Sequence, residues 1–144
     1  MPTDVKTKLG NFLKKFTETV PVEYAALIHI PTGETITRTI TPAVPHSYFE
    51  ENIEKFKELI DLSEEIAVTK AMGDLYGTIL RGSKGYEIVA RLSESVLLVC
   101  GGTDVGSLGI TLLRIVELKD TIKKREREES EEEKKLFIIF FPAS

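Results

Sequence analysis

The chain has 144 residues, of which 19 are basic and 23 are acidic, so its net charge is −4. This length predicts one domain with a substantial hydrophobic core. A net-negative chain without a basic stripe is a poor nucleic-acid binder, because neutralising phosphates supplies most of that affinity, and we expect no nucleic-acid partner.

The N-terminal part of the chain predicts a helix followed by a β-hairpin. Apolar residues recur at helical spacing over 4–18, which predicts the first helix. The apolar segment 23–30 leads into a Pro-Thr-Gly-Glu turn at 31–34. Residues 35–40 then alternate threonine or arginine with isoleucine, which is typical of a half-buried strand.

A long amphipathic helix is predicted over 47–72. Ser47, with Glu50 three residues later, fits a capping box, and Gly73 suits the position after the helix end. One face carries a seam of large apolar side chains: Phe49, Ile53, Phe56 and Ile60. This seam packs either on the chain's own sheet or against a partner. A neighbouring apolar face, with Leu59, Leu62 and Ile66, favours some burial against a second chain.

Three more strands and a final helix complete the predicted domain. The strands are expected over 75–82, 86–93 and 96–102, and the last is apolar throughout, as expected of a strand buried on both faces. After a Gly-rich turn, apolar residues at helical spacing begin the last helix. The order α-β-β-α-β-β-β-α predicts an α/β domain of the α+β type, in which helices flank a five-stranded antiparallel sheet.

The composition divides the chain in two at residue 122. Residues 123–135 hold six basic and six acidic residues, with opposite charges at i,i+4 that favour a helix. An apolar segment follows: Leu136, Phe137, Ile138, Ile139, Phe140 and Phe141. We interpret 1–122 as the domain and 123–144 as a charged helical extension. Its apolar segment is a candidate partner-binding tail. It could instead fold back on its own domain or dimer mate, and contact with a membrane interface is the least favoured alternative.

No motif in the sequence predicts catalysis or a cofactor. The Gly-rich turn at 101–109 lacks both the Lys and Ser/Thr of a Walker A loop and the G-x-G-x-x-G spacing, so we interpret it as a tight turn into a helix. His29 and His46 do not combine with Cys100 at a metal-binding spacing, and no nucleophile lies in a hydrolase signature. We therefore expect neither an enzyme nor a metal or other cofactor.

The composition also bears on the compartment. The single cysteine excludes a disulfide framework and favours a reducing environment. The N-terminus lacks the apolar run of a signal peptide, and no run approaches the ~20 apolar residues of a membrane span. We therefore expect a cytoplasmic protein. The absence of glutamine and tryptophan, with abundant glutamate and lysine, suggests a thermophilic source.

The order of elements and several segments resemble the Roadblock/LC7 family over 4–122. The matching features are the first helix before EYAALIHIPTGETI, the long second helix, the strands YEIVARL and VLLVC, and the Gly-containing turn into Leu108-Gly109. Profilin-like, longin-like and PAS-like modules share a similar order of elements. A small-ligand-binding sensor of such a fold is therefore the alternative function.

The resemblance implies a non-catalytic homodimer, or a dimer with a related chain. Family members serve as scaffolds or regulators of small Ras-like GTPases, or as dynein-associated light chains, and a thermophilic source would favour the GTPase. They pair through the second helix and the third strand, so that two sheets join edge to edge. Carried over to this sequence, the interface falls on Phe49, Ile53, Phe56, Ile60, Tyr76, Thr78 and Leu80.

Overall fold

The computed structural model describes the backbone of residues 3–39 and 41–140, and the side chains of residues 3–39 and 41–128. The helices are α1 (Thr3–Thr19), α2 (Tyr48–Thr69), the short 3₁₀ helix η1 (Val105–Ser107) and α3 (Leu108–Phe140). The strands are β1 (Tyr24–His29), β2 (Glu34–Arg38), β3 (Thr78–Arg81), β4 (Tyr86–Arg91) and β5 (Val96–Gly102). The order of elements confirms the predicted α+β fold.

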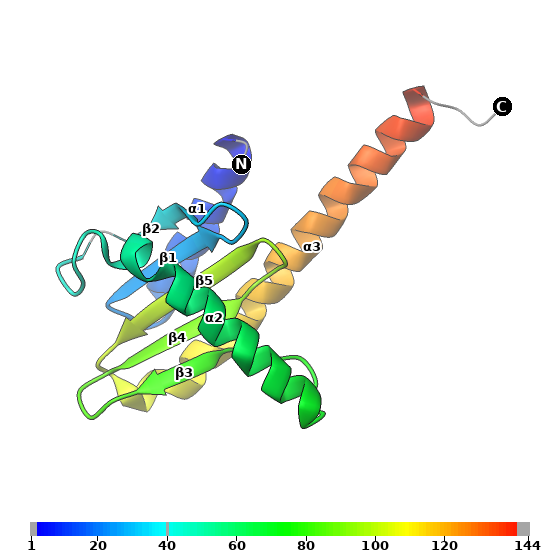
Figure 1. Cartoon of the computed structure of the whole chain (residues 1–144). Helices are drawn as coiled ribbons and strands as arrows, with labels where there is room; N and C mark the ends of the chain where they lie inside the picture. The colour runs from blue at the N-terminus through cyan, green and yellow to red at the C-terminus, as the bar shows by residue number, and fades with distance from the viewer. Residues whose placement is uncertain (1–2, 40, 141–144) are drawn as a thin grey trace.

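The strands form one antiparallel sheet in the order β2-β1-β5-β4-β3, so β5 is central and β2 and β3 are the edges. Helix α2 crosses one face of the sheet, and α1 and α3 pack on the other (Figure 1). All seven residues of β5 are buried. The prediction that this strand is covered on both faces is therefore confirmed.

Apolar side chains fill both sides of the sheet, because a strand sends alternate residues to opposite faces. Along β5, Leu97 and Val99 face α2, whereas Leu98 and Cys100 face α1 and α3. The buried helix residues on the α1–α3 side are Leu9, Leu13, Phe16, Ile115, Leu118 and Ile122. Each large side chain buried in these layers stabilises the fold by about 2 kcal/mol.

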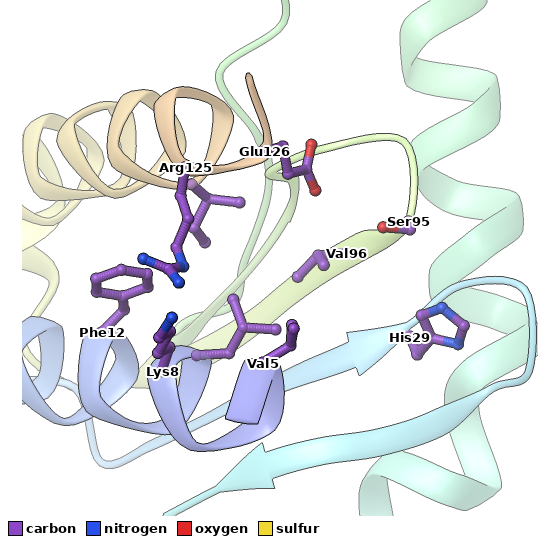
Figure 2. A pocket seen from close by; sticks show the side chains of 10 residues that line it. Val5, Lys8, Phe12, His29, Ser95, Val96, Arg125 and Glu126 are labelled. Carbon is purple, nitrogen blue, oxygen red and sulfur yellow. The ribbon is translucent and has the colours of Figure 1, made fainter. Parts of the chain in front are cut away.

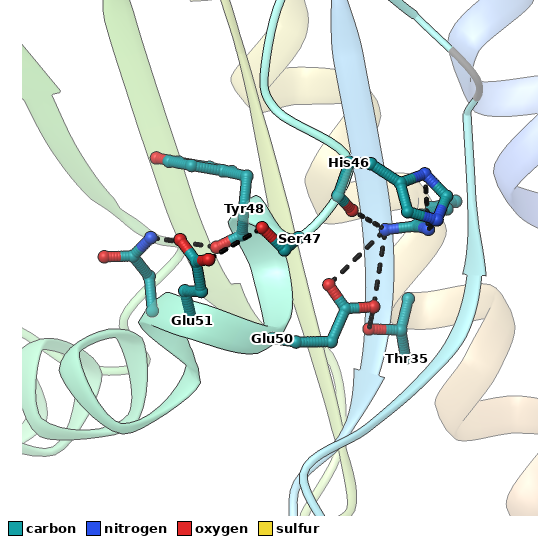
Figure 3. Close-up of polar contacts among 8 residues, drawn as sticks. Thr35, His46, Ser47, Tyr48, Glu50 and Glu51 are labelled. Carbon is teal, nitrogen blue, oxygen red and sulfur yellow. Dashed lines mark hydrogen bonds and ion pairs between the residues drawn. The ribbon is translucent and has the colours of Figure 1, made fainter.

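The first turn of α2 differs from the prediction. Ser47 occupies the N-cap position but makes no capping hydrogen bond, and its hydroxyl donates to Glu51 Oε1 at 2.7 Å. Glu50 lies 3.3 Å from Nη1 of Arg38 in β2 (Figure 3). The predicted capping box is therefore wrong. The Glu50 carboxylate forms an ion pair with Arg38 of the sheet, and the Ser47 side chain makes no capping hydrogen bond.

Helix α2 ends in a Schellman motif before the predicted position. The N–H of Met72 donates to the carbonyl of Ala67 at 2.9 Å, and the N–H of Ala71 donates to that of Val68 at 3.1 Å. Ala71 therefore takes the left-handed backbone, with φ 56°, that was predicted for Gly73. Gly73 also has a positive φ, 81°, but it lies in the connection to β3.

Strand β3 is shorter than the predicted segment 75–82. The carbonyl of Leu75 accepts a hydrogen bond from Lys119 of α3 at 3.3 Å, so this residue is tied to a helix before the strand begins. The edge strand is therefore only four residues long, from Thr78 to Arg81.

Helix α3 runs without a break across the predicted boundary at residue 122. Its first part packs on the sheet, Arg125 and Glu126 still lie near α1, and the part beyond them projects away from the domain for about 21 Å (Figure 1). The backbone of residues 136–140, in the predicted tail, continues this helix. Phe141 lies outside the described residues. The binding role of the tail stays a prediction.

Candidate interaction surface

The apolar seam of α2 lies inside this chain. Phe49, Phe56 and Ile60 are 2%, 5% and 1% exposed and pack on the sheet, with Ile53 half-buried beside them. The structure therefore shows the alternative in which the seam packs on its own sheet. Side chains that fill the core cannot also present a free surface to a second chain. The available part of α2 lies elsewhere on the helix.

The exposed apolar residues of α2 lie in its C-terminal half, which extends past the β3 edge (Figure 1). Leu62 and Ile66 are four residues apart and so share one flank of the helix; Ile66 is 65% exposed. Val68, on another flank, and Met72, just beyond the helix, are also exposed. The sequence analysis placed Leu62 and Ile66 on a second apolar face that favours burial against another chain. The predicted interface residues nevertheless did not include them.

Strand β3 is the open edge beside this half of α2. Within the described residues it pairs with β4 and has no strand on its other side. Leu80 is opposite Glu87, so both point to the face that α2 covers, and Leu80 is 50% exposed. Tyr76, just before the strand, is exposed, whereas Thr78 is half-buried. Two predicted interface residues therefore reach the surface, at a strand edge that can template pairing.

A polar cluster fixes the first turn of α2 to the sheet. Tyr24 of β1 and Tyr48 of α2 donate hydrogen bonds to the same oxygen, Oε2 of Glu87, at 2.7 Å from the Tyr24 hydroxyl. The two rings meet edge to face, with centroids 5.9 Å apart. Burial, reinforced by the hydrogen bond to Glu87 and its charge, raises the pKa of both tyrosines well above the ordinary value. Two neutral phenols therefore surround one carboxylate and orient the helix.

We expect the free energy of unfolding to fall as the pH rises above about 10, because tyrosines of the unfolded chain ionise there while Tyr24 and Tyr48 stay protonated in the folded chain. The stability that their raised pKa provides is complete below this pH and is lost above it. Urea unfolding at about pH 8 and about pH 11 measures the loss. The Tyr24→Phe/Tyr48→Phe double variant should lose less stability between the two pH values. An equal loss in both proteins would contradict the role of these phenols.

Two arginines of the sheet hold α2 by ion pairs. Arg91 of β4 lies 2.7 Å from Asp61 and also contacts a second carboxylate of the helix. Arg38 of β2 contacts Glu50 together with the carbonyl and ring of His46, around the start of α2 (Figure 3). The helix is therefore pinned to the sheet at its start and again at Asp61 and Glu64 in its C-terminal half. The flank of that half with Leu62 and Ile66 stays exposed.

The histidines and the cysteine that were considered for metal binding or catalysis are held in contacts within the fold. Cys100 is fully buried, and burial raises the pKa of its thiol. Nδ1 of His29 lies 2.8 Å from the hydroxyl of Thr32 in the β1–β2 turn. In the part of the chain that the structure describes, no group of three or more His, Cys, Asp or Glu is placed to hold a metal ion. No helix among those residues is long and apolar enough to cross a membrane.

Solved structures share this fold at low sequence identity. MglB from Myxococcus xanthus has a TM-score of 0.68 at 17% identity, with 89% of this chain and 94% of that chain covered. A gliding protein MglB from Thermus thermophilus has a TM-score of 0.67 at 14% identity, over 87% of this chain and 95% of that chain.

A Roadblock/LC7 domain from Streptomyces avermitilis has a TM-score of 0.65 at 10% identity, over 82% of this chain and 97% of that chain. No family model and no curated protein sequence matches the chain. The five-stranded sheet, the helices on its two faces and these structural matches together show that the chain has the Roadblock/LC7 fold.

Proposed function

We propose that the chain dimerises through the C-terminal half of α2 and the β3 edge, and that the dimer is a non-catalytic platform for a small Ras-like GTPase. The observation that carries the dimer is the open β3 edge beside exposed apolar side chains: Leu62, Ile66, Tyr76 and Leu80. Self-association also occurs in this fold, since one similar solved structure is described as MglB with a tetrameric arrangement.

Pairing of two β3 edges would give hydrogen-bond partners to the backbone N–H and C=O groups on the outer side of β3. It would also join the two sheets into one. The same pairing would cover the exposed parts of Ile66 and Leu80. A two-fold axis makes such an interface self-complementary, so each residue of the patch contributes twice. Phe49, Phe56 and Ile60 support this surface from beneath, because they hold α2 on the sheet.

Leu80→Lys is expected to dissociate the dimer, because symmetry brings two lysines into one apolar interface. We expect the dimer to be weakened by at least about 2 kcal/mol. Sedimentation equilibrium measures the change. Leu113→Lys is the matched control, because Leu113 of α3 is about as exposed as Leu80 (52% against 50%) but lies on the other side of the sheet. A dimer that survives Leu80→Lys, or that dissociates equally with Leu113→Lys, would contradict this interface.

The GTPase partner rests on the family resemblance, and it is tested by binding. The immobilised chain is incubated with lysate of the source organism, and any small GTPase that it retains is purified and loaded with GDP or with a GTP analogue. We expect one such GTPase to bind the wild-type chain and to bind Leu80→Lys less well. Its rate of GTP hydrolysis should change when the wild-type dimer is added.

The predicted tail provides a second comparison in the same experiment. A bait that lacks residues 136–144 should retain less of the GTPase if these residues bind the partner. Equal recovery with both baits would contradict a partner-binding tail. Failure of both baits to retain a small GTPase would contradict the proposed GTPase partner while leaving the dimer intact.

A further inference from the structure

A groove runs between α1 and α3 on the face of the sheet opposite α2. It has two hollows that share Phe12 of α1. The first hollow, of about 360 Å³, opens where α3 leaves the domain (Figure 2). The second hollow, of about 300 Å³, lies nearer the start of α3. Its lining consists of Phe12, Lys15, Phe16, Thr19, Arg114, Glu117, Leu118 and Thr121.

The second hollow has an apolar floor between two helices. Phe16 and Leu118 are 5% and 7% exposed, and Phe12 is half-buried beside them. Thr19 of α1 and Thr121 of α3 are exposed at its rim. An apolar floor between two helices accepts the apolar face of a third helix. This hollow therefore suits an apolar helical segment from outside the domain.

One segment of this chain, residues 136–141, is apolar throughout. Its backbone over 136–140 is helical. Because all six residues are apolar, docking does not depend on which of them meet the groove. The segment cannot reach the groove of its own chain, since α3 is continuous and places Ile138 about 30 Å along the helix from Leu118. A second copy of the chain can bring the segment there.

We propose that segment 136–141 of one copy docks in the second hollow of another copy, with the two α3 helices antiparallel. Removal of apolar residues from water drives this contact. A two-fold axis makes it reciprocal, so each pair of chains forms it twice. The contact is separate from the proposed dimer, because the sheet lies between the groove and α2. It would link one dimer to another.

The order of charges along α3 supports this arrangement. With Ile138 of one copy over Leu118 of the other, the two helices cross at residue 128, which is midway between them in sequence. The two lysines at 123–124 then lie opposite the two glutamates at 132–133 of the other copy. Opposite charges across an interface fix its register and orientation.

The first hollow fits this order of charges less well. With Ile138 beside Arg125, the crossing point would move to about residue 131. The glutamates at 131–133 of both copies would then meet and repel one another. The charges therefore select the second hollow as the docking site.

A single contact of this kind is weak. The docked segment has only six residues, and exposed ion pairs contribute little. We expect an association constant on the order of 100 µM, well above the micromolar concentrations at which the dimer is measured.

A fluorescein-labelled peptide of residues 132–144 tests the docking by fluorescence anisotropy with the full chain. Thr121→Trp places a ring over the second hollow and should weaken peptide binding at least about tenfold. Asp120→Trp is the matched control, because Asp120 is the adjacent exposed residue of α3 and lies outside the lining. It should change the affinity by less than about twofold. Circular dichroism shows whether both variants are folded.

A second probe does not depend on how the Trp variants fold. The same peptide with Phe137→Glu and Phe140→Glu should lose its binding to the wild-type chain, because charged residues cannot be buried on the apolar floor. Absence of binding by the unchanged peptide, equal binding of the two peptides, or an equal effect of Thr121→Trp and Asp120→Trp would overturn the proposal.

Sedimentation equilibrium of the full chain at about 200 µM tests the role of the second copy. The wild-type chain should exceed the mass of a dimer, and a chain with Phe137→Glu and Phe140→Glu should not. Equal masses would overturn the proposal. Leu80→Lys should abolish the dimer but leave peptide binding unchanged, so failure of this docking and failure of the proposed dimer are distinguishable.

Discussion

Phe49→Ala is expected to lower the free energy of unfolding by about 3–5 kcal/mol, which is the usual cost of removing a buried phenylalanine. The ring is 2% exposed and lies between α2 and the sheet, beside the rings of Tyr24 and Tyr48. Its loss leaves a cavity that the pinned helix cannot close. Urea unfolding monitored by circular dichroism measures the change.

Leu113→Ala is the control for this variant, since it removes an exposed side chain from α3. We expect it to change the free energy of unfolding by less than about 0.5 kcal/mol. Both variants are measured at several protein concentrations, because dimerisation adds a concentration-dependent term. If Phe49→Ala costs no more than the control and alters dimer dissociation instead, the placement of Phe49 in the core of the single chain is contradicted.

Gly101→Ala is expected to destabilise the protein by about 2–3 kcal/mol, because it overpacks the central strand. A Cβ at this position would lie 2.5 Å from the carbonyl oxygen of Tyr86 and 2.6 Å from Cζ of Tyr24, and would also collide with the Tyr24 hydroxyl. The ring of Tyr24 is held in place by Glu87, and the carbonyl belongs to the neighbouring strand β4. Neither atom can move without disturbing the sheet or the polar cluster.

Gly109→Ala provides a comparison of opposite sign. A Cβ at this position meets no atom within 4 Å, and the residue lies in α3, where alanine is favoured over glycine. We expect a stabilisation of about 0.5 kcal/mol. Thermal unfolding of both variants measures the difference. A Gly101→Ala protein as stable as the wild type would show that the Tyr24 cluster does not constrain the central strand as described.

The sequence predicted the elements well because their signals are local. The 3.6-residue period of α1 and α2, the alternation in β2 and the continuous apolar run of β5 each depend on neighbouring residues. The errors at the ends of α2 have non-local causes. At the start of α2, Glu50 pairs with Arg38, twelve residues away in sequence, and so does not complete the predicted capping box. At its end, the Schellman hydrogen bonds terminate the helix before Gly73.

The candidate surface could be predicted only in part, since it depends on strand order. A periodic pattern identifies the apolar face of α2 without saying what covers it, so Phe49 and its seam could be assigned to a core or to a partner. The identity of β3 as an open edge, and the overhang of α2 beyond it, follow from the arrangement of the whole sheet. The contact between Tyr24 and Glu87 joins residues 63 apart in sequence, which no local pattern reveals.

The mass of the wild-type protein in solution is the most direct test of the central claim, that the β3 edge and the C-terminal half of α2 pair two copies of this chain. Size-exclusion chromatography with light scattering, at micromolar concentration, gives this mass without a label or a partner. We predict twice the 16.1 kDa of one chain. A single species at 16.1 kDa would contradict the dimer and, with it, the platform proposed here.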